Sequence, residues 1–443
     1  KRSLSSLTSY LTFCMFMIRL SSFGHAFVLP TTRILIRTCK HSTPRIHQGR
    51  GIKQIRLFAS SPKNVAIVGG GLAGLSTTYH LLKKSKGEGE NLHITIFDKV
   101  EPGQGGASSV AGGLLHPFSP RGKLVHLGIE GLERTNALID AAKLHRPECV
   151  LQDRIYRIAL TDKNKEQLEQ TADLHPQYAE WLSSEDILEQ CMSGSSDSAP
   201  TLGGIRLSNG CKVVNVPAYL QGLWGVCQEL SGGAATWSIT DPVATTTGAK
   251  CIDWKEKLKP FDTVVFAAGS GLFHDAILEK DAVDFPAQLI RGQSIEMTLP
   301  SSSDYSNEAM LCGKYLAPMT NKNQVLIGAT HEFQADALDA DGVQSELRKR
   351  SYDIAPKVWD EGTVDKITIG YRVQSQRGKY GRMPIIGQST HNDVHDNTWI
   401  FTGLSSRGLI YHGVYGDLLS TVILEGDESA ILENHPDVYW WKQ

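Results

Sequence analysis

Residues 1–60 contain no aspartate and no glutamate, and the first acidic residue of the chain is Glu88. The same stretch contains ten Lys or Arg and fourteen Ser or Thr. This composition is typical of a targeting peptide and differs from that of a folded domain. We therefore predict that residues 1–60 are a targeting presequence.

Two cleavage patterns compete within this presequence. The run LTFCMFMI is followed by small residues at Gly24–Ala26, which would leave Phe27 as the new N-terminus. That pattern resembles the two-part presequences of algal plastids bounded by extra membranes. Arg56–Phe58 before Ala59 resembles a mitochondrial cleavage site instead. We predict import into a plastid, with the mitochondrion as the alternative.

Several other absences exclude function classes. No two cysteines have C-x-x-C spacing, so the sequence indicates neither a zinc site nor a dithiol pair, and we predict no metal. After the presequence, no apolar run reaches the ~18 residues that a membrane span needs. Of the 45 basic residues ten lie in the presequence, so residues 61–443 carry 35 basic and 47 acidic residues, a net charge of −12. This charge disfavours a nucleic-acid partner.

Residues 64–76, NVAIVGGGLAGLS, carry the strongest motif. An apolar run typical of a buried strand enters a G-x-G-x-x-G turn formed by Gly69, Gly71 and Gly74, and residues with helical spacing follow. The next strand, LHITIFD, ends at Asp98, where an acidic residue is expected to bind a ribose. The pattern predicts a dinucleotide whose pyrophosphate lies at the helix N-terminus.

The dinucleotide is predicted to be FAD. No second G-x-G-x-x-G follows, so a separate nicotinamide-binding domain is not indicated. Residues 103–120, GQGGASSVAGGLLHPFSP, are rich enough in glycine to pack their backbone against a flat ligand. A later buried strand, FDTVVFAAG at 261–269, ends in small residues. Together these features favour FAD as a resident cofactor.

These motifs, with RGQS, YLAPMTNKNQVLIGATHEF, GYR, PIIG and FTGLSSRGLIYHG, occur in the order seen in D-amino-acid-oxidase-type flavoproteins. The chain resembles this family over residues 62–430. Two members that it resembles are glycine oxidase and the flavin domain of the bacterial enzyme that trims carboxymethylaminomethyl-uridine in tRNA. The resemblance implies FAD, two interleaved domains, and oxidation of a C–N bond beside a carboxylate.

We therefore expect an α/β fold in which a Rossmann-like FAD-binding domain is interleaved with a smaller α+β substrate (cap) domain. The FAD-binding domain is predicted to use residues 62–145, 200–275 and 366–443, and the substrate domain residues 146–199 and 276–365. Within the second FAD-binding segment, Asn209-Gly210 lies between two alternating runs and predicts a β-hairpin. VPAYLQGLWGVCQEL, which follows, predicts a helix.

The residues expected to bind FAD lie in the two glycine-rich segments, after the Asp98 strand, after the later buried strand and in GLSSRGL. They are Gly69, Gly71, Leu72, Ala73, Gly74, Asp98, Lys99, Gly106, Ala107, Ser108, Ala111, Gly112, Gly113, Leu114, Ala268, Gly269, Gly403, Ser406, Arg407, Gly408 and Leu409. In the last segment, a helix is expected to direct its positive N-terminal end toward the flavin.

Three residues are predicted to form the catalytic site. Arg372, in ITIGYRVQS, matches the arginine with which the family holds the substrate carboxylate, although a domain-interface ion pair is the alternative. Tyr315 matches a residue that lines the glycine oxidase pocket, or it is a core tyrosine with a satisfied hydroxyl. Arg407 is expected near the flavin or in the pocket. His116 and His412 are either catalytic or internal hydrogen-bonding groups.

Two further positions bear on the site. Cys312 does not lie in the sequence context of the family members that link FAD to a cysteine, so we expect a noncovalent flavin. The segment QSQRGKYG after Arg372, with Arg382 directly after it, adds Arg377, Lys379 and Arg382 where the family usually has an aspartate and a proline. It indicates either a solvated loop or a substrate with more negative charge than glycine.

The sequence thus predicts an FAD-dependent oxidoreductase that acts on a small amino acid or N-substituted glycine. Oxygen is the expected electron acceptor, and an electron carrier is the alternative. Two other functions stay open: flavin-dependent trimming of a tRNA uridine side chain, and a non-catalytic flavoprotein that serves as an assembly factor.

Overall fold

The computed structural model describes residues 63–89, 91–192, 201–240, 252–273, 286–333, 338–389 and 395–442. The chain divides into residues 1–56 and 57–443, and every element below belongs to the second unit. The predicted presequence, residues 1–60, lies outside the described residues, and so does Cys251.

A six-stranded, mostly parallel sheet contains the glycine motif, with strand order β18-β19-β10-β1-β2-β9. Strand β1 is parallel to β2 and β10, and the edge strand β18 is antiparallel to β19. The strands are β1 (Asn64–Val68), β2 (His93–Asp98), β9 (Thr236–Ile239), β10 (Thr263–Phe266), β18 (Ile385–Gln388) and β19 (Thr398–Thr402). This sheet confirms the predicted α/β class and Rossmann-like arrangement.

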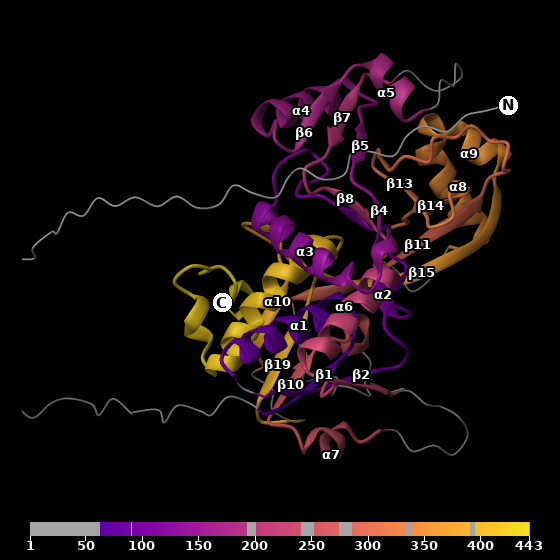
Figure 1. Cartoon of the computed structure of the whole chain (residues 1–443). Helices are drawn as coiled ribbons and strands as arrows, with labels where there is room; N and C mark the ends of the chain where they lie inside the picture. The colour runs from indigo at the N-terminus through magenta and orange to yellow at the C-terminus, as the bar shows by residue number, and fades with distance from the viewer. Residues whose placement is uncertain are drawn as a thin grey trace, which may run out of the picture. The chain divides into compact units, whose positions relative to one another are not determined.

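Apolar side chains pack on both faces of this sheet, which explains the uninterrupted apolar sequence of β1. Val65 and Ile67 pack into the main core, which includes helices on one face, and Ala66 and Val68 pack with Trp254 of α7 on the other (Figure 1). The helices of this part are α1 (Leu72–Gly87), α3 (Gly128–Ala142), α6 (Val216–Leu230), α7 (Trp254–Leu258) and α10 (Gly408–Glu425).

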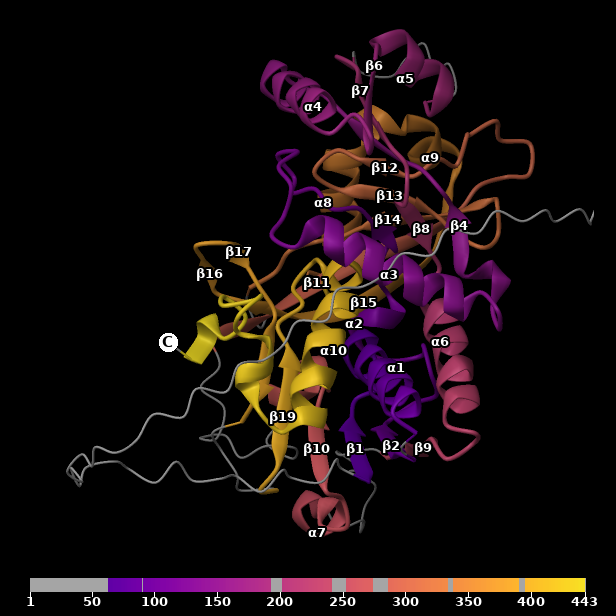
Figure 2. The same ribbon diagram turned by 60° about the vertical axis from the view of Figure 1, so that its left-hand side comes forward.

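The second sheet has eight strands in the order β15-β11-β14-β13-β12-β5-β7-β6, and all its neighbours are antiparallel except β12 and β5. Its own core includes residues of α5, α8 and α9, and Figure 2 shows these helices around it. The elements are β5 (Ile155–Ile158), α4 (Asp162–Leu174), β6 (Ala179–Leu182), α5 (Ser184–Gln190), β7 (Gly204–Leu207), β11 (Ala287–Thr298), β12 (Met310–Leu311), β13 (Tyr315–Pro318), β14 (Gln324–Gly328), α8 (Ala340–Ser351), α9 (Pro356–Glu361) and β15 (Thr363–Ser375).

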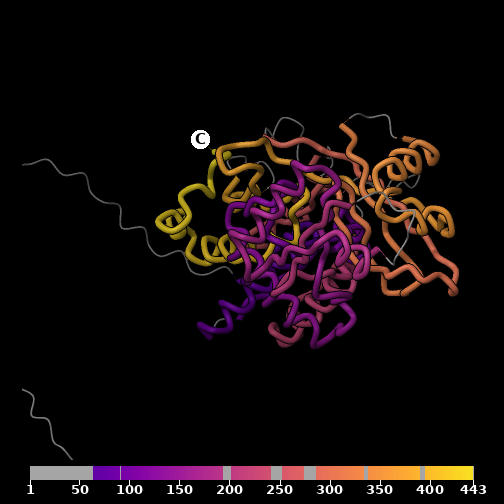
Figure 3. Tube along the Cα trace, turned by 90° about the horizontal axis from the view of Figure 1, so that it is seen from above, coloured from indigo at the N-terminus to yellow at the C-terminus, as the bar shows by residue number. Residues whose placement is uncertain are grey.

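Short elements lie outside the two large sheets. A three-stranded sheet has the order β3-β8-β4, and β16 pairs with β17 in a small hairpin. These elements are α2 (Gly106–Ser109), β3 (Leu114–Leu115), η1 (Pro147–Cys149), β4 (Val150–Gln152), β8 (Lys212–Val214), η2 (Gly269–Phe273), η4 (Tyr352–Ile354), β16 (Arg377–Gly378), β17 (Gly381–Arg382), η5 (Glu428–Ile431) and η6 (Trp440–Lys442). From above, the orange segments with β11 to β15 and the yellow C-terminal segment lie on opposite sides of the indigo and magenta segments (Figure 3).

The hairpin predicted at Asn209-Gly210 is wrong. The two residues do form a turn with positive φ angles of 50° and 98°, but the flanking strands β7 and β8 belong to different sheets. β7 pairs with β5 and β6, whereas β8 pairs with β3 and β4. Long-range strand partners therefore prevailed over the local turn signal.

The predicted helix after this turn is confirmed as α6, where the N–H of Ala218 donates to the Asn215 side chain at 3.2 Å. Two strands inside the residue ranges predicted for the FAD-binding domain, β7 and β15, lie in the eight-stranded sheet. The predicted domain ranges otherwise stay a prediction, because both sheets belong to the unit formed by residues 57–443.

Candidate active site

The glycine loop between β1 and α1 offers uncapped backbone groups. Gly71 is the N-cap of α1 and has no side chain that could cap the helix, and the Leu72 N–H makes only a long contact of 3.4 Å with Ser108 Oγ. A Cβ at Gly71 would lie 3.2 Å from Ser108 Oγ, and a Cβ at Gly69, where φ is +104°, would lie 2.5 Å from Ala268 Cα. Free N–H groups beside a surface kept clear of side chains fit a pyrophosphate.

The Asp98 carboxylate lies beside this loop at the end of β2. Its Oδ2 accepts a hydrogen bond from the Gly70 N–H at 2.7 Å, and its Oδ1 accepts one from the Val100 N–H at 3.3 Å. The position is the one predicted for a ribose contact, because the carboxyl ends of parallel strands form the ligand-binding edge of such a sheet. The neighbouring Lys99 is exposed.

The other predicted FAD-binding segments meet the same edge. A Cβ at Gly408, the first residue of α10, would lie 2.9 Å from Leu72 Cδ1, so the N-termini of α1 and α10 are adjacent. Ser108 Oγ accepts a hydrogen bond from the Leu72 N–H at 3.4 Å. Gly106 and Gly269 have positive φ angles and open space where a side chain would be. The predicted segments are therefore brought together, and their glycine positions keep side chains out of the space a dinucleotide needs.

Tyr315 joins the cofactor segments to the second sheet. A Cβ at Gly112 would lie 2.6 Å from the Tyr315 ring. The Tyr315 hydroxyl lies 3.0 Å from Ser294 Oγ on β11. Burial raises the pKa of Tyr315, while the Ser294 hydrogen bond and the nearby Arg372 charge lower it. Tyr315 thus has a satisfied hydroxyl, and its ring stands against a predicted FAD-binding residue.

Arg372 lies on β15, opposite Ile290 of β11. Its Nη2 donates a long hydrogen bond of 3.4 Å to the Thr330 carbonyl and lies 3.5 Å from His331 Nδ1. Burial lowers the pKa of this guanidinium. None of the ion pairs between residues that the structure describes includes Arg372. Its donors are therefore poorly used by the protein itself, as a carboxylate-binding arginine requires.

Arg407 is the N-cap of α10, and the loop before it contacts the strand that carries Arg372. The Ser405 N–H donates to the Val373 carbonyl at 3.0 Å, and Leu404 forms a β-bridge with Gln374. This crossing brings the end of β15 next to the loop before α10. Burial lowers the pKa of the half-buried His116, and the charges of Arg157 and Arg407 lower it further. Burial raises the pKa of Tyr411, and the Arg407 charge partly opposes this shift.

His412 is buried and His116 is half-buried, and both form hydrogen bonds within the protein. The Phe118 N–H donates to His116 Nδ1 at 3.3 Å. His412 Nε2 lies 2.7 Å from the Tyr219 hydroxyl, and its Nδ1 lies 3.0 Å from the Gly408 carbonyl. Burial lowers the pKa of both histidines, that of His412 to about 4. These contacts favour the hydrogen-bonding interpretation over a catalytic one.

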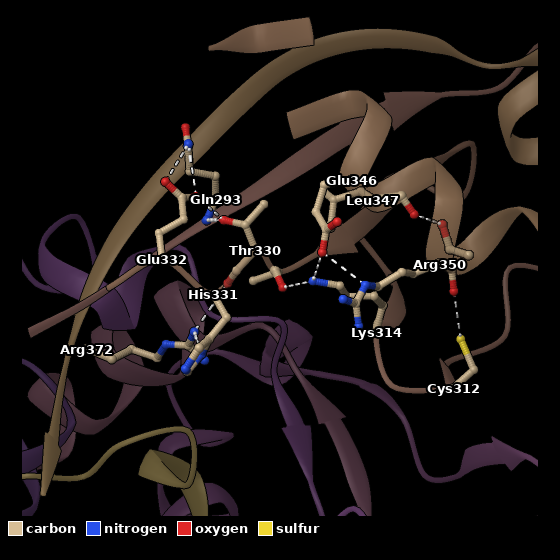
Figure 4. Close-up of polar contacts among 12 residues, drawn as sticks. Gln293, Cys312, Lys314, Thr330, His331, Glu332, Glu346, Leu347, Arg350 and Arg372 are labelled. Carbon is tan, nitrogen blue, oxygen red and sulfur yellow. Dashed lines mark hydrogen bonds and ion pairs between the residues drawn. The ribbon is translucent and has the colours of Figure 1, made fainter. Parts of the chain in front are cut away.

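Cys312 and Arg372 lie on opposite sides of the group of residues drawn in Figure 4. Its Sγ contacts the Arg350 carbonyl at 3.5 Å, and burial raises its pKa to about 11. The thiol therefore lies against α8, beside neither the glycine loop nor Arg372.

Sequence reasoning missed the residues that hold Arg372 in place. Glu332 accepts hydrogen bonds from the Thr330 hydroxyl and, at 3.2 Å, from Gln293 Nε2, and Figure 4 shows these residues together with His331 and Arg372. The motifs RGQS and GATHEF contain these side chains, but their contact depends on the pairing of β11 with β14. Arg157, buried on β5 beside His116, was also missed. A charged residue inside the apolar run IYRI was its signal.

Two kinds of feature have no counterpart among the described residues. No helix found there combines the length and apolar character of a membrane span. No three His, Cys, Asp or Glu side chains in those ranges are grouped so that they could hold a metal ion.

Comparison with known proteins agrees with this geometry. The family model described as FAD dependent oxidoreductase (DAO) matches residues 64–421. The uncharacterized oxidoreductase YurR of Bacillus subtilis (strain 168) is 24% identical over 381 residues, which cover 82% of this chain and 95% of YurR.

Two solved structures have the same fold at low identity. Iminodiacetate oxidase from Chelativorans sp. BNC1 has a TM-score of 0.61 and 19% identity, covering 82% of this chain and 95% of its own. Glycine oxidase from Geobacillus kaustophilus has a TM-score of 0.60 and 20% identity, covering 84% of this chain and 96% of its own.

Proposed function

The chain belongs to the DAO family of FAD dependent oxidoreductases, and from this premise we propose that it oxidises the C–N bond of an amino acid or an N-substituted glycine. The supporting observation is Arg372, a half-buried guanidinium without an ion pair among the described residues. It lies beside Tyr315, whose ring contacts the predicted FAD-binding residue Gly112. A carboxylate bound there would place its α-carbon near the cofactor.

The glycine loop around Gly71 would hold FAD, which would supply the acceptor for a hydride from the carbon bearing the amine. The protein has to orient that carbon and exclude water, and it needs no strong acid or base when the amine binds neutral. The planar fork of Arg372 suits both oxygens of one carboxylate. Contacts with the Thr330 carbonyl and His331 hold the guanidinium toward this position.

The remaining site residues complete this arrangement. Tyr315, held by Ser294, forms a wall between the carboxylate position and Gly112. The N-terminus of α10 and the Arg407 charge stabilise negative charge that develops nearby. Burial and the charges of Arg372, Lys314 and Arg382 lower the pKa of His331, so this imidazole is neutral at pH 7 and adds no further positive charge.

Oxygen is the proposed electron acceptor. Iminodiacetate oxidase and glycine oxidase, which share the fold, are oxidases by name. The alternative is an electron carrier such as a quinone.

The deciding experiment is anaerobic reduction of the purified, FAD-loaded protein by a panel of amino acids and N-substituted glycines. We expect at least one carboxylate-bearing amine to bleach the flavin absorbance and air to restore it. Bleaching that a quinone reverses and air does not would indicate a dehydrogenase. Bound FAD that no amine of the panel bleaches would contradict the proposal and favour a non-catalytic flavoprotein.

We also propose that the protein acts in a plastid. The support is the presequence composition, with ten basic and no acidic residues in positions 1–60 and the LTFCMFMI run before Gly24–Ala26. The mitochondrion is the alternative compartment.

A further inference from the structure

The hairpin β16–β17 places two arginines directly opposite each other. Arg377 pairs with Arg382 across the two strands. Like charges in this position are destabilising, and neither residue takes part in an ion pair within the described part of the structure. The arrangement is therefore unfavourable unless an anion offsets it.

The three basic residues of this segment differ in orientation. Arg377 and Lys379 are exposed, and Lys379 Nζ lies 4.9 Å from the centre of the Tyr380 ring. Arg382 is half-buried, and its Nη1 donates to the Ser375 carbonyl at 2.5 Å. Arg382 therefore turns back toward the end of β15, the strand that carries Arg372.

Arg407 approaches the same hairpin from α10. Its Nη1 lies 3.9 Å from the position of a Cβ on Gly381. Arg407, like Arg382, takes part in no ion pair that the described residues form. The backbone crossing at Ser405 and Val373 holds this region next to Arg372. Three guanidinium groups thus surround the end of β15.

A single substrate carboxylate does not account for all three guanidinium groups. One planar carboxylate satisfies one guanidinium fork, which leaves Arg382 and Arg407 without an anionic partner. The FAD pyrophosphate is expected at the N-terminus of α1, beside Gly71 and Ser108. Half-buried positive charges without a negative counter-charge are costly, so a second anionic group is the simplest reason for their presence.

We propose that the amine substrate carries a second acidic group, which Arg382 and Arg407 bind while Arg372 holds the carboxylate next to the amine. The substrate class is therefore a dianionic amine, either dicarboxylic or with a carboxylate and a phosphate. This inference rests on the proposed function and specifies its substrate.

The test measures ligand binding to the FAD-loaded protein by titration calorimetry. The ligands are propionate with one acidic group, malonate, succinate and glutarate with two carboxylates, and 3-phosphonopropionate. We expect the best two-acid ligand to bind about tenfold or more tightly than propionate, because hydrogen bonds to charged groups are the strong ones. The phosphonate distinguishes a phosphate from a carboxylate at the second position.

Substitutions assign this preference to the hairpin. Arg382→Gln should abolish the preference and leave propionate binding within about threefold, whereas Arg382→Lys should retain part of it. Lys379→Gln removes a positive charge from the exposed side of the same hairpin and is the matched control. Folding of each variant is checked by its urea midpoint, and FAD affinity by flavin fluorescence.

Several results would overturn the inference. The first is equal affinity for ligands with one and with two acidic groups. The second is that Arg382→Gln weakens the binding of one-acid and two-acid ligands equally, and the third is that it weakens only the binding of FAD. In those cases propionate binding that depends on Arg372 would leave the proposed function intact. If Arg372→Gln changes no ligand's affinity, the proposed function fails as well.

Discussion

At the scale of single residues, His412 is held in one protonation state by its neighbours. Its Nδ1 lies 3.0 Å from the Gly408 carbonyl and so carries the proton, while Nε2 accepts from the Tyr219 hydroxyl at 2.7 Å. Burial lowers the pKa of this imidazole from 6.5 to about 4. His412 therefore stabilises the contact between α10 and α6 only while it is neutral.

This predicts an acid-sensitive fold. In the unfolded chain the His412 imidazole is protonated below its ordinary pKa of 6.5, whereas in the folded chain it is protonated only near pH 4. The contribution of neutral His412 to stability is therefore fully present above pH 6.5 and is lost as the pH falls toward 4. At about pH 5 the loss from one such histidine is about 2 kcal/mol. In His412→Gln, urea midpoints should change less between neutral pH and about pH 5 than in the wild type.

The exposed His93→Gln variant is the control for this measurement, because it removes an imidazole from the surface. An unchanged pH slope in His412→Gln would show that the buried imidazole does not couple to folding.

Arg372→Gln tests the proposed carboxylate contact. Loss of the two charged hydrogen bonds is expected to raise KM for a carboxylate-bearing amine by about a hundredfold, with Arg372→Lys in between. FAD content should not change, because Arg372 does not lie in the glycine loop. The measurement is the rate of anaerobic flavin reduction against amine concentration.

Arg121→Gln, at an exposed loop position, is the control for Arg372→Gln. Equal reduction kinetics in wild type and Arg372→Gln would remove this residue from the site.

At the scale of elements, helix α1 contains a matched pair of glycines. A Cβ at Gly71 would point at Ser108 from 3.2 Å, in the space expected for the pyrophosphate, whereas a Cβ at Gly87 would meet nothing within 4 Å. We predict that Gly71→Ala weakens FAD binding by about tenfold or more while the apoprotein stays folded. Gly87→Ala should leave FAD binding unchanged and stabilise the helix by about 0.5–1 kcal/mol.

Flavin fluorescence gives the FAD affinity of these two variants, and urea titration gives their stability. Equal FAD affinity for both would mean that the cofactor does not approach Gly71.

The elements also differ in how well the sequence predicted them. β1, β2 and α1 were predictable, because apolar periodicity and the glycine turn act within one short segment. The Asn209-Gly210 turn was recognised, but its strands pair elsewhere, since strand pairing depends on partners distant in the sequence. For the same reason, the alternation of apolar and polar residues along β15 did not predict that this strand belongs to the eight-stranded sheet.

At the scale of the whole molecule, the candidate site is assembled from segments far apart in the chain. Tyr315 comes from β13, Arg372 from β15 and Arg407 from the start of α10. The motif order of the family predicted all three positions, and the residues that orient them, such as Ser294 and Thr330, became visible only through sheet pairing.

The targeting prediction also belongs to the whole chain. Residues 1–60 fused to a fluorescent protein are expected to direct it to plastids, because the segment combines positive charge, hydroxyl side chains and an early apolar run. Fluorescence microscopy of the fusion decides between plastid and mitochondrion. A fusion to residues 63–120 is the control, and a diffuse signal for residues 1–60 would contradict the prediction.

The sequence by itself determined the dinucleotide loop, the α/β class and the family, because glycine spacing and apolar periodicity are local properties that long-range contacts do not override here. Tertiary structure alone decided that Arg382 turns back to the Ser375 carbonyl at the end of β15, that Arg407 approaches Gly381, and that β7 and β8 belong to different sheets. The reason is physical: hydrogen bonding between strands and the burial of charge depend on which distant segments come together, and one-dimensional spacing does not encode that choice.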